Sequence, residues 1–223
     1  MSAASPVLGS KFLEGLPKAG VTEILAAASH RRFLARSVIA NQGHPADNLY
    51  LLSEGCARHF FLTPDGRKVF LLWMAPGDVI GGASILSKPT PYYFSTEMVK
   101  DSWAYVWPRR IIRELAARHP LLLENGLSIA ADYISWYFAA HLALISHTAR
   151  QRLAHVLVGL ASTFGEKSKD GIALDVTNED LASEANVTPF TASRVLSQWQ
   201  RSGAIVKSRG KLLLRHPERL SSH

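Results

Sequence analysis

The sequence predicts an α+β chain in three consecutive regions: a roll of short β-strands, one long helix, and a small C-terminal domain of helices and a β-hairpin. Three observations carry this prediction. Short apolar runs separated by Gly, Pro and Asp turns fill residues 32–107. An apolar heptad stripe follows, and two short capped helices with a hairpin end the chain. The expected domain boundaries are 1–118, 119–147 and 148–223.

Composition narrows the class of protein. The chain has 223 residues, of which 47% are hydrophobic and 19% are charged, a balance typical of a folded globular protein. No apolar run approaches the ~20 residues of a membrane span, and the first residues lack a signal-peptide core. Cys56 is the single cysteine, which excludes a disulfide framework, a CxxC metal site and an iron–sulfur cluster held by four thiolates. We therefore expect a cytoplasmic protein without a membrane partner.

The first region has the texture of an antiparallel β-structure. Residues 1–30 are expected to form a short helical lead-in without chemistry. Turn signals at 63–66 (TPDG) and 75–78 (APGD) then separate the apolar runs of the β-region. A meander of this kind predicts a barrel, roll or sandwich. The expected strands are Leu49 to Leu52, Arg58 to Leu62, Val69 to Met74 and residues 103–107.

The hydrophobic period then changes to that of a helix. Residues 121–147 are expected to form one helix of about 40 Å. An apolar seam of this length usually packs against a copy of itself, so a homodimer is the favoured interpretation. Packing of the helix on the chain's own β-region is the alternative. The expected dimer seam consists of Leu127, Ala131, Ile134, Phe138, His141 and Ile145.

The C-terminal region carries strong helix signals. A further amphipathic helix is expected from Arg150 to Phe164, closed by Gly165 and followed by a polar loop at 166–171. Thr177 then precedes Asp180 by three residues, which resembles a capping box and predicts the start of a short helix. A tight turn at 186–187 follows this helix, and the next helix is expected to end at about Arg201. Residues 204–215 predict a two-stranded β-wing.

Helix, turn, helix and wing form a winged helix-turn-helix, whose second helix enters the DNA major groove. Thr188 would cap that helix, and Pro189 suits its first position because it lacks an N–H group. Arg194 can present a bidentate fork to guanine. Val195, Leu196 and Trp199 are expected to form its buried face. The predicted DNA-binding residues are Thr177, Thr188, Pro189, Phe190, Thr191, Ser193, Arg194, Lys207, Arg209 and Lys211.

The charge distribution agrees with a DNA-binding surface. The net charge is +7, and residues 188–216 contain six Lys or Arg and no Asp or Glu. Such a segment attracts phosphates in a salt-dependent way. A solvated basic face, or a module that docks a protein partner, is the alternative interpretation. An enzyme is not expected, because no carboxylate pair, metal-ligand spacing or nucleophile with an adjacent base is present.

These motifs carry a family resemblance. The stretch TNEDLASEANVTPFTASRVL (177–196) resembles the helix-turn-helix of the cyclic-AMP receptor protein and fumarate–nitrate regulator (CRP/FNR) family of bacterial transcription factors. Residues 48–86, with the DGR hairpin and PGD-x-IG stretch, are similar to the family's cyclic-nucleotide-binding roll. The helix that ends in residues 149–162 is similar to the family's dimer helix and hinge. The resemblance covers residues 30–215. It implies a homodimeric transcription regulator on the nucleoid, with a two-fold symmetric operator and RNA polymerase as partners.

The residues at the nucleotide site depart from the family pattern. Members that bind cyclic AMP carry a Glu for the ribose where this chain has Gly82, and an Arg-Ser/Thr pair for the phosphate near residues 94–96. An anionic phosphate without a guanidinium would be buried unpaired. We therefore expect that cyclic AMP is not bound. The residues assigned to the effector pocket are Gly81, Gly82, Ser84, Phe94, Ser95, Thr96, Tyr137 and Phe138.

The content of that pocket stays open at the level of sequence. Phe94, Tyr137 and Phe138 could pack it shut, or a planar or apolar effector could enter it. Haem is one candidate effector, with His141 or His147 as its axial ligand, and a redox role of Cys56 is a weaker one.

The resemblance also bears on base recognition. Members of the family that read G·C pairs commonly carry a Glu where this chain has Phe190. A phenyl ring can contact a thymine methyl but cannot accept from cytosine. We predict that Arg194 contacts guanine and that Phe190 shifts the neighbouring preference towards T.

Overall fold

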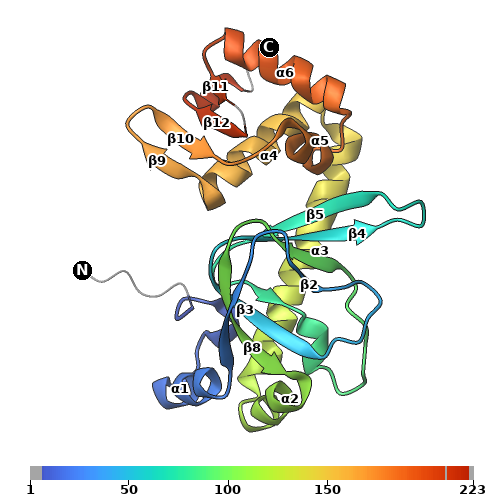
Figure 1. The fold of residues 1–223 in the computed structure, drawn as a ribbon, viewed down its shortest axis with the longest axis vertical. Helices are drawn as coiled ribbons and strands as arrows, with labels where there is room; N and C mark the ends of the chain where they lie inside the picture. Colours follow the sequence, from blue (N-terminus) through green and yellow to red (C-terminus); the bar gives the residue numbers. More distant parts are fainter. Residues whose placement is uncertain (1–6, 209, 221–223) are drawn as a thin grey trace. The chain divides into compact units, whose positions relative to one another are not determined.

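The computed structural model describes residues 7–208 and 210–220, and the chain divides into two compact units, Met1–Ser135 and Trp136–His223. Figure 1 shows the β-strands of the first unit and the helices and hairpins of the second. This α+β architecture confirms the predicted fold class.

Two four-stranded antiparallel sheets build the first unit. They pack face to face around an apolar core of side chains from most of these strands, including Leu52, Met74 and Met98. The arrangement confirms the predicted β-roll. One sheet has the order β1 (Ser29–Phe33), β8 (Ser102–Pro108), β3 (Asn48–Glu54) and β6 (Val79–Ile80). The other has the order β2 (Val38–Ala40), β7 (Ser95–Met98), β4 (Ala57–Leu62) and β5 (Lys68–Met74).

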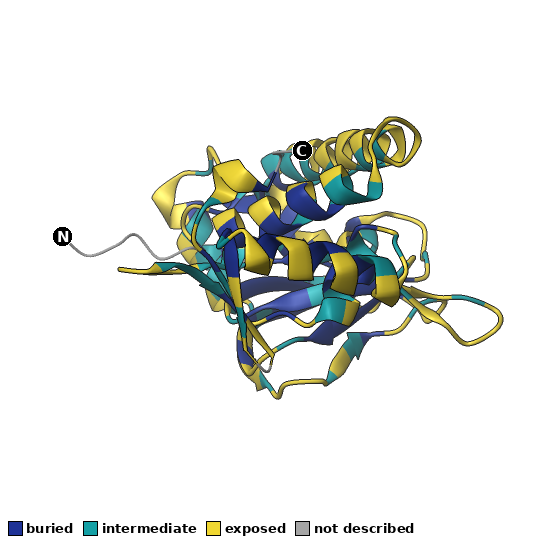
Figure 2. Cartoon of the chain, turned by 90° about the horizontal axis from the view of Figure 1, so that it is seen from above, coloured by how far each residue is buried: buried dark blue, intermediate teal, exposed yellow. Residues whose placement is uncertain are grey.

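Helices cover the outer face of the first sheet. A second core joins β3 and β8 to four short elements and the beginning of α3. The indole N–H of Trp107 donates to the carbonyl of Ile24 at 2.7 Å and fixes α1 to the sheet. Buried residues accordingly line the strands and the inner sides of the helices (Figure 2). The short elements are η1 (Lys11–Leu13), α1 (Lys18–Ala26), η2 (Gly82–Ile85) and α2 (Arg109–Arg118).

The helical lead-in predicted for residues 1–30 is wrong at its end. Helix α1 stops at Ala26, and Ser29–Phe33 forms strand β1, which pairs with β8 in a continuous antiparallel register. Pairing with a distant strand outweighs the local preference of this segment. The turns predicted at 63–66 and 75–78 are confirmed by hydrogen bonds from Gly66 N to Thr63 O and from Asp78 N to Ala75 O.

Helix α3 (Leu121–Ser146) begins in the first unit and ends in the second, and it confirms the single long helix predicted from the heptad stripe. Among its large apolar residues Leu127, Ile134, Phe138 and Ile145 are 73%, 56%, 67% and 74% exposed. The other seam residues, Ala131 and His141, are exposed as well. The predicted seam is therefore accessible in the single chain. No helix among the described residues has the length and apolar character to cross a bilayer.

Within its described residues, the second unit contains three further helices and one four-stranded sheet. The helices are α4 (Ala149–Phe164), α5 (Asn178–Glu184) and α6 (Pro189–Arg201), with a final turn η3 (Pro217–Arg219). The sheet has the order β11 (Ile205–Ser208), β12 (Lys211–Leu214), β10 (Gly171–Leu174) and β9 (Glu166–Ser168).

The polar loop predicted after α4 is instead the hairpin β9–β10. Strand β10 pairs with β12, so the predicted two-stranded wing is the edge of a larger sheet. The correction has a tertiary cause: the pairing joins Ile172 to Leu214, 42 positions further along the chain. Gly171 permits it with a φ of 139°, and a Cβ at this position would lie 2.4 Å from the carbonyl oxygen of Leu214.

Candidate nucleic-acid interface

Helix α5 begins and ends with well-defined caps. The hydroxyl of Thr177 accepts a hydrogen bond from Asp180 N at 3.1 Å, and the carboxylate of Asp180 accepts one from Thr177 N at 3.0 Å. This is the predicted capping box. At the other end, Asn186 has a φ of 48°, and the amides of Asn186 and Val187 donate to Ser183 and Ala182. The pair of bonds is a Schellman motif with Asn in the left-handed position.

The next helix, α6, begins as the sequence predicts. Thr188 is its N-cap: the hydroxyl accepts from Thr191 N at 3.1 Å and lies 2.9 Å from the Thr191 hydroxyl. Pro189 occupies the first helical position, where no N–H group is needed. The opposite face is buried, since Ala192, Val195, Leu196 and Trp199 are almost inaccessible. Packing on this face directs the remaining residues of α6 outwards.

The outward residues of the first turns form the candidate reading surface. Phe190 is 79% exposed, and Ser193 and Arg194 are exposed as well. A phenyl ring left in water at a helix N-terminus has no packing role in the unit. Arg194 follows Phe190 by four residues, so a planar cation lies one turn beyond the apolar ring on the same face of the helix.

The wing supplies further positive charge near the start of α5. A cavity of about 400 Å³ lies between them, lined by residues of both segments that include Thr177, Lys207 and Lys211. Lys211 is exposed, with its Nζ 4.0 Å from the carboxylate of Asp175. Arg209 lies outside the described residues. The two lysines of the lining suit contact with a phosphate backbone, and Glu179 is the acidic residue among the lining residues.

The residues assigned to the effector pocket divide between the two units. In the first unit Gly81 has a φ of 79°, and a Cβ there would lie 2.6 Å from the carbonyl oxygen of Asn48. Gly82, by contrast, has open space on its side-chain side, and a Cβ added there would meet no atom within 4 Å. Ser84 is fully buried, and its hydroxyl has no hydrogen-bond partner among the described residues. Gly81 is thus required by its positive φ and by the close approach of Asn48. Residues 81–84 carry no charged side chain.

Strand β7 places two polar residues of this set inside the roll. The hydroxyl of Thr96 lies 2.8 Å from Nδ1 of His59, and the hydroxyl of Ser95 accepts from Gln42 N at 3.0 Å. The ring of Phe94 lies 6.0 Å from that of His59. Burial lowers the pKa of His59 to about 4, so the imidazole is neutral at pH 7.

Tyr92 is a residue of this region that sequence reasoning missed. It is buried, and its hydroxyl accepts from Asn48 N at 3.0 Å and donates to Asn48 O at 2.9 Å. A Cβ on Gly81 would lie 2.9 Å from its ring. Tyr92 thus fills space beside the glycine turn. Its only sequence signal was an aromatic residue shortly before the predicted phosphate position.

The remaining members of the pocket set lie in the second unit on α3. Tyr137 is half-buried, and its pKa is raised by burial and, to a lesser extent, by the charge of Glu184. Phe138 is exposed. His141 and His147, considered as haem ligands, are exposed too. Among the described residues no three His, Cys, Asp or Glu side chains are grouped to hold a metal ion.

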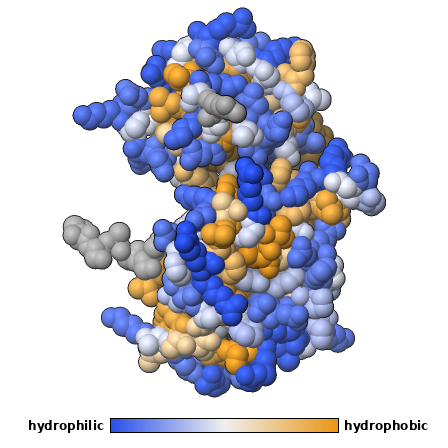
Figure 3. Space-filling model, in the orientation of Figure 1, coloured by the Kyte–Doolittle hydropathy of each residue, from blue (hydrophilic) through white to orange (hydrophobic). Residues whose placement is uncertain are grey.

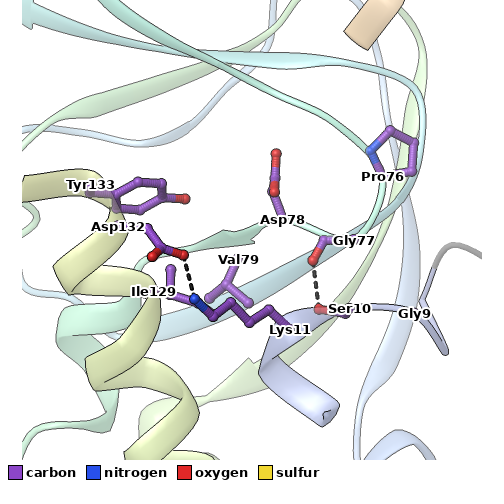
Figure 4. Close-up of a pocket in the computed structure, with 10 residues that line it drawn as sticks. All are labelled: Gly9, Ser10, Lys11, Pro76, Gly77, Asp78, Val79, Ile129, Asp132 and Tyr133. Atoms are coloured by element: carbon purple, nitrogen blue, oxygen red, sulfur yellow. Dashed lines mark hydrogen bonds and ion pairs between the residues drawn. The ribbon is translucent and has the colours of Figure 1, made fainter. Parts of the chain in front are cut away.

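Another cavity, of about 220 Å³, lies in the first unit between the N-terminal segment, the β5–β6 turn and α3 (Figure 4). Lys11 Nζ lies 2.5 Å from a carboxylate oxygen of Asp132, and the hydroxyl of Ser10 donates to Gly77 O at 2.6 Å. Burial raises the pKa of Asp78. The ion pair between Lys11 and Asp132 joins the N-terminal segment to α3 beside this cavity. The cavity was not part of the predicted pocket.

Comparison with known proteins identifies both halves of the chain. The cyclic nucleotide-binding domain family matches residues 30–119, and the Crp-like helix-turn-helix domain family matches residues 151–222. The anaerobic regulatory protein of Bacillus subtilis (strain 168) is 24% identical over 204 residues, which are 86% of this chain and 82% of that protein. The CRP-like cAMP-activated global transcriptional regulator of Mycobacterium tuberculosis (strain H37Rv) is 27% identical over 182 residues, 81% of each chain.

A solved structure agrees with these relatives. The CRP family transcriptional regulator TTHB099 of Thermus thermophilus is 26% identical, with a TM-score of 0.73 over 85% of this chain and 94% of that one. Because the relatives are transcription regulators, the expectation that the chain is not an enzyme is confirmed. The two domains, their order and the helix-turn-helix all agree with the resemblance read from the sequence. The chain belongs to the CRP/FNR family of transcription regulators, with a cyclic nucleotide-binding domain followed by a helix-turn-helix DNA-binding domain.

Proposed function

We propose that the chain acts as a homodimer that binds a two-fold symmetric DNA operator and that its β-roll does not bind cyclic AMP. The observation that carries the DNA part is the exposed tip of α6, where Phe190 and Arg194 project from a helix whose other face is buried. The N-terminal turn of such a helix is the part that reaches base edges in the major groove.

Each predicted DNA-binding residue has a role in this proposal. Arg194 donates to guanine, and Phe190 contacts a thymine methyl. Ser193 is exposed next to Arg194 in the same turn of α6. Thr177, Thr188 and Thr191, with Pro189 as the rigid first residue of α6, place helix N-termini against phosphates. Lys207, Arg209 and Lys211 add salt-dependent attraction from the wing.

The homodimer is supported by the exposed apolar residues of α3. Figure 3 shows apolar side chains on the surface of one face of the molecule among hydrophilic ones. Together with Ala131 and His141, the exposed residues of α3 follow the alternating four- and three-residue spacing of a coiled-coil seam; the large apolar ones are Leu127, Ile134, Phe138 and Ile145. Burial of this seam against a second copy would remove the apolar surface from water. The operator half-sites would then lie about one helical turn, ~34 Å, apart.

The proposal against cyclic AMP rests on the glycine turn and its neighbours. Gly82 offers no carboxylate to a ribose, and the stretch from Tyr92 to Thr96 carries no cation for a phosphate. The hydroxyl of Tyr92 is already bonded to the backbone of Asn48. The Mycobacterium tuberculosis relative is named as cAMP-activated, so this chain would differ from it in its effector.

In the cell the dimer would act at the nucleoid, with RNA polymerase as a further partner. We assign residues 1–118 to the sensor domain, 119–147 to dimerisation and 148–223 to DNA binding.

Selection of binding sites from random DNA, followed by band-shift titration, tests the DNA proposal. We expect a palindrome and a steep decrease of affinity with salt. Arg194→Ala should weaken binding to that palindrome by about 1–3 kcal/mol and relax the preference at one base pair. Arg201→Ala removes the same charge from the exposed last turn of α6 and should weaken all sequences equally. Absence of a selected palindrome, or equal behaviour of the two variants, would refute the assignment.

Cyclic AMP is tested on the same complex. Titration calorimetry should detect no binding to the purified chain, and the affinity for the palindrome should stay unchanged when cyclic AMP is added. An increase of DNA affinity with cyclic AMP would contradict the proposal for the roll while leaving the DNA assignment intact.

A further inference from the structure

Arg152 lies in the first turn of α4, immediately after the junction between α3 and α4. Its side chain donates three hydrogen bonds, all to backbone carbonyl groups. Nε donates to Ala185 O at 2.9 Å, Nη1 to His147 O at 2.8 Å and Nη2 to Asn186 O at 3.2 Å. The Arg152 side chain is partly buried. Its bonds join residue 147 to residues 185–186, which lie more than thirty positions further along the chain.

The three acceptors belong to the C-terminal ends of two helices. His147 directly follows the last residue of α3, while Ala185 is the C-cap of α5. Asn186 is the left-handed residue of the turn before α6. The last carbonyls of a helix have no intrahelical partner and carry a partial negative charge. The Arg152 guanidinium therefore donates to carbonyl groups at the C-terminal ends of both α3 and α5.

The segment beyond Arg152 is held together as a body. Helix α4 contacts both α5 and α6, and Arg150 donates to the side chain of Gln198 on α6 at 3.2 Å. Rotation of α4 therefore carries the two DNA-binding helices with it. The backbone link from α3 to this body is short, because only His147 and Thr148 separate the two helices. A bond from Arg152 back to His147 O restricts the dihedral angles of that link.

We propose that Arg152 is a positioning residue that locks the end of α3 to the turn in front of α6, so that the orientation of the reading helix follows the orientation of α3. The inference rests on the proposed homodimer and operator. A planar guanidinium has the geometry to serve three carbonyls, whereas a lysine ammonium at the end of a flexible stem does not. In a dimer joined through α3, this lock fixes the direction and separation of the two reading helices.

The consequence is selectivity for the spacing of half-sites. Adding or removing one base pair shifts one half-site by ~3.4 Å and rotates it by about a tenth of a turn. A locked dimer cannot follow that shift without breaking contacts. A dimer whose helix-turn-helix pivots freely about His147 and Thr148 can follow it. Tyr137 on α3 also lies close to Glu184 on α5, so we expect partial rather than complete loss of selectivity.

The test uses the full chain and its selected palindrome, with spacers of the selected length and of one base pair more or less. The measured quantity is the ratio of Kd values for shifted and selected spacers. Wild type should give a ratio of about tenfold or more, equivalent to roughly 1.4 kcal/mol. Arg152→Gln and Arg152→Lys should give less than about threefold. Arg219→Gln is the matched control, because Arg219 bonds the C-cap carbonyl of α6 at Ser202 without reaching α3.

A general loss of folded protein would raise all Kd values together and leave the ratio unchanged, so the ratio separates positioning from stability. Ratios for Arg152→Gln and Arg152→Lys equal to that of wild type would overturn the inference. So would a relaxed ratio in Arg219→Gln, or failure of the conservative Arg152→Lys variant to fold by circular dichroism. If wild type selects no palindrome, the proposed function itself fails. Selection of a palindrome by wild type establishes it independently of Arg152.

Discussion

His59 illustrates how a single residue of the roll responds to its surroundings. It lies on β4 opposite Thr96, with one ring nitrogen 2.8 Å from the Thr96 hydroxyl. Burial lowers its pKa from 6.5 to about 4, because a charged imidazole would lose its hydration. At neutral pH the residue is an uncharged polar group in an apolar core.

The pKa of His59 predicts a dependence of stability on pH. Above pH 6.5 the imidazole is neutral in both the folded and the unfolded state, so the titration of His59 does not lower the free energy of unfolding there. As the pH falls from 6.5 towards 4, the unfolded chain binds a proton that the folded chain refuses, so the free energy of unfolding falls. The slope is up to roughly 1.4 kcal/mol per pH unit. Urea unfolding of wild type and His59→Gln at several pH values measures it, and parallel curves for the two proteins would contradict the prediction.

Cys56 is also best understood from its burial. Burial raises the pKa of its thiol to about 12, and the side chain is 4% exposed. A thiol of this kind is a poor nucleophile at neutral pH, because the reactive form is the thiolate. The redox role considered for Cys56 at the sequence level gains no support from its position.

Phe190 carries the sharpest prediction on base recognition. Its ring is 79% exposed at the tip of α6 and can contact a thymine methyl. Phe190→Glu should move the selected base at the adjacent step from T to C, because a carboxylate accepts from cytosine N4. Selection from random DNA with both proteins measures the change. Phe190→Leu is the control that keeps an apolar side chain and should retain T, and retention of T by Phe190→Glu would contradict the assignment.

At the level of elements, α6 depends on its first turn. The hydroxyl of Thr188 accepts a hydrogen bond from the otherwise unpaired amide of Thr191. Pro189 has no amide N–H, so it leaves no donor unpaired at the first helical position. The helix is then held by its buried face, with the indole N–H of Trp199 donating to Leu220 O at 3.2 Å. Local signals and packing agree on the same boundaries, which is why this element was predictable.

Loss of the cap should therefore weaken α6 locally. We expect Thr188→Ala to lower the stability of the helix by about 1 kcal/mol, because the amide of Thr191 loses its acceptor. Amide hydrogen exchange in the first turn of α6 measures this as faster exchange. Thr188→Ser keeps the hydroxyl and should exchange as wild type does. Equal protection in the Ala and Ser variants would show that the cap contributes nothing.

At the scale of the whole molecule, the exposed apolar residues of α3 are the basis of the proposed homodimer. A helix with Leu127 and Ile145 more than 70% exposed leaves a large apolar area in water unless a partner covers it. A second copy would also place two reading helices in a two-fold arrangement. In the proposed dimer, assembly and DNA recognition would thus be linked through one helix.

Leu127→Asp should disrupt the dimer, because a buried unpaired carboxylate costs several kcal/mol. Sedimentation equilibrium should show a shift from dimer to monomer, and affinity for the palindrome should fall by more than about tenfold as the two-site advantage is lost. Ser128→Asp introduces the same charge one residue along, turned about 100° around the helix, and should leave the dimer intact. A Leu127→Asp protein that remains a dimer would place the interface elsewhere.

The sequence by itself determined the elements whose causes are local. Thr177, Thr188, Pro189 and Asn186 specify caps and a turn through contacts within a few residues, so the helix-turn-helix was predicted with its boundaries. The heptad stripe likewise specified α3, because helical periodicity is visible in one segment. The turns of the roll followed from Gly, Pro and Asp.

The tertiary structure alone decided what depends on distant partners. Strand β1 and hairpin β9–β10 form because β8 and β12 offer free edges, which no local pattern reveals. The buried hydroxyl of Tyr92 and the three carbonyls around Arg152 are likewise brought together from remote segments. Apart from the local bond from Arg152 to His147 O, these hydrogen bonds link residues thirty or more positions apart, so their geometry follows from packing of the whole unit.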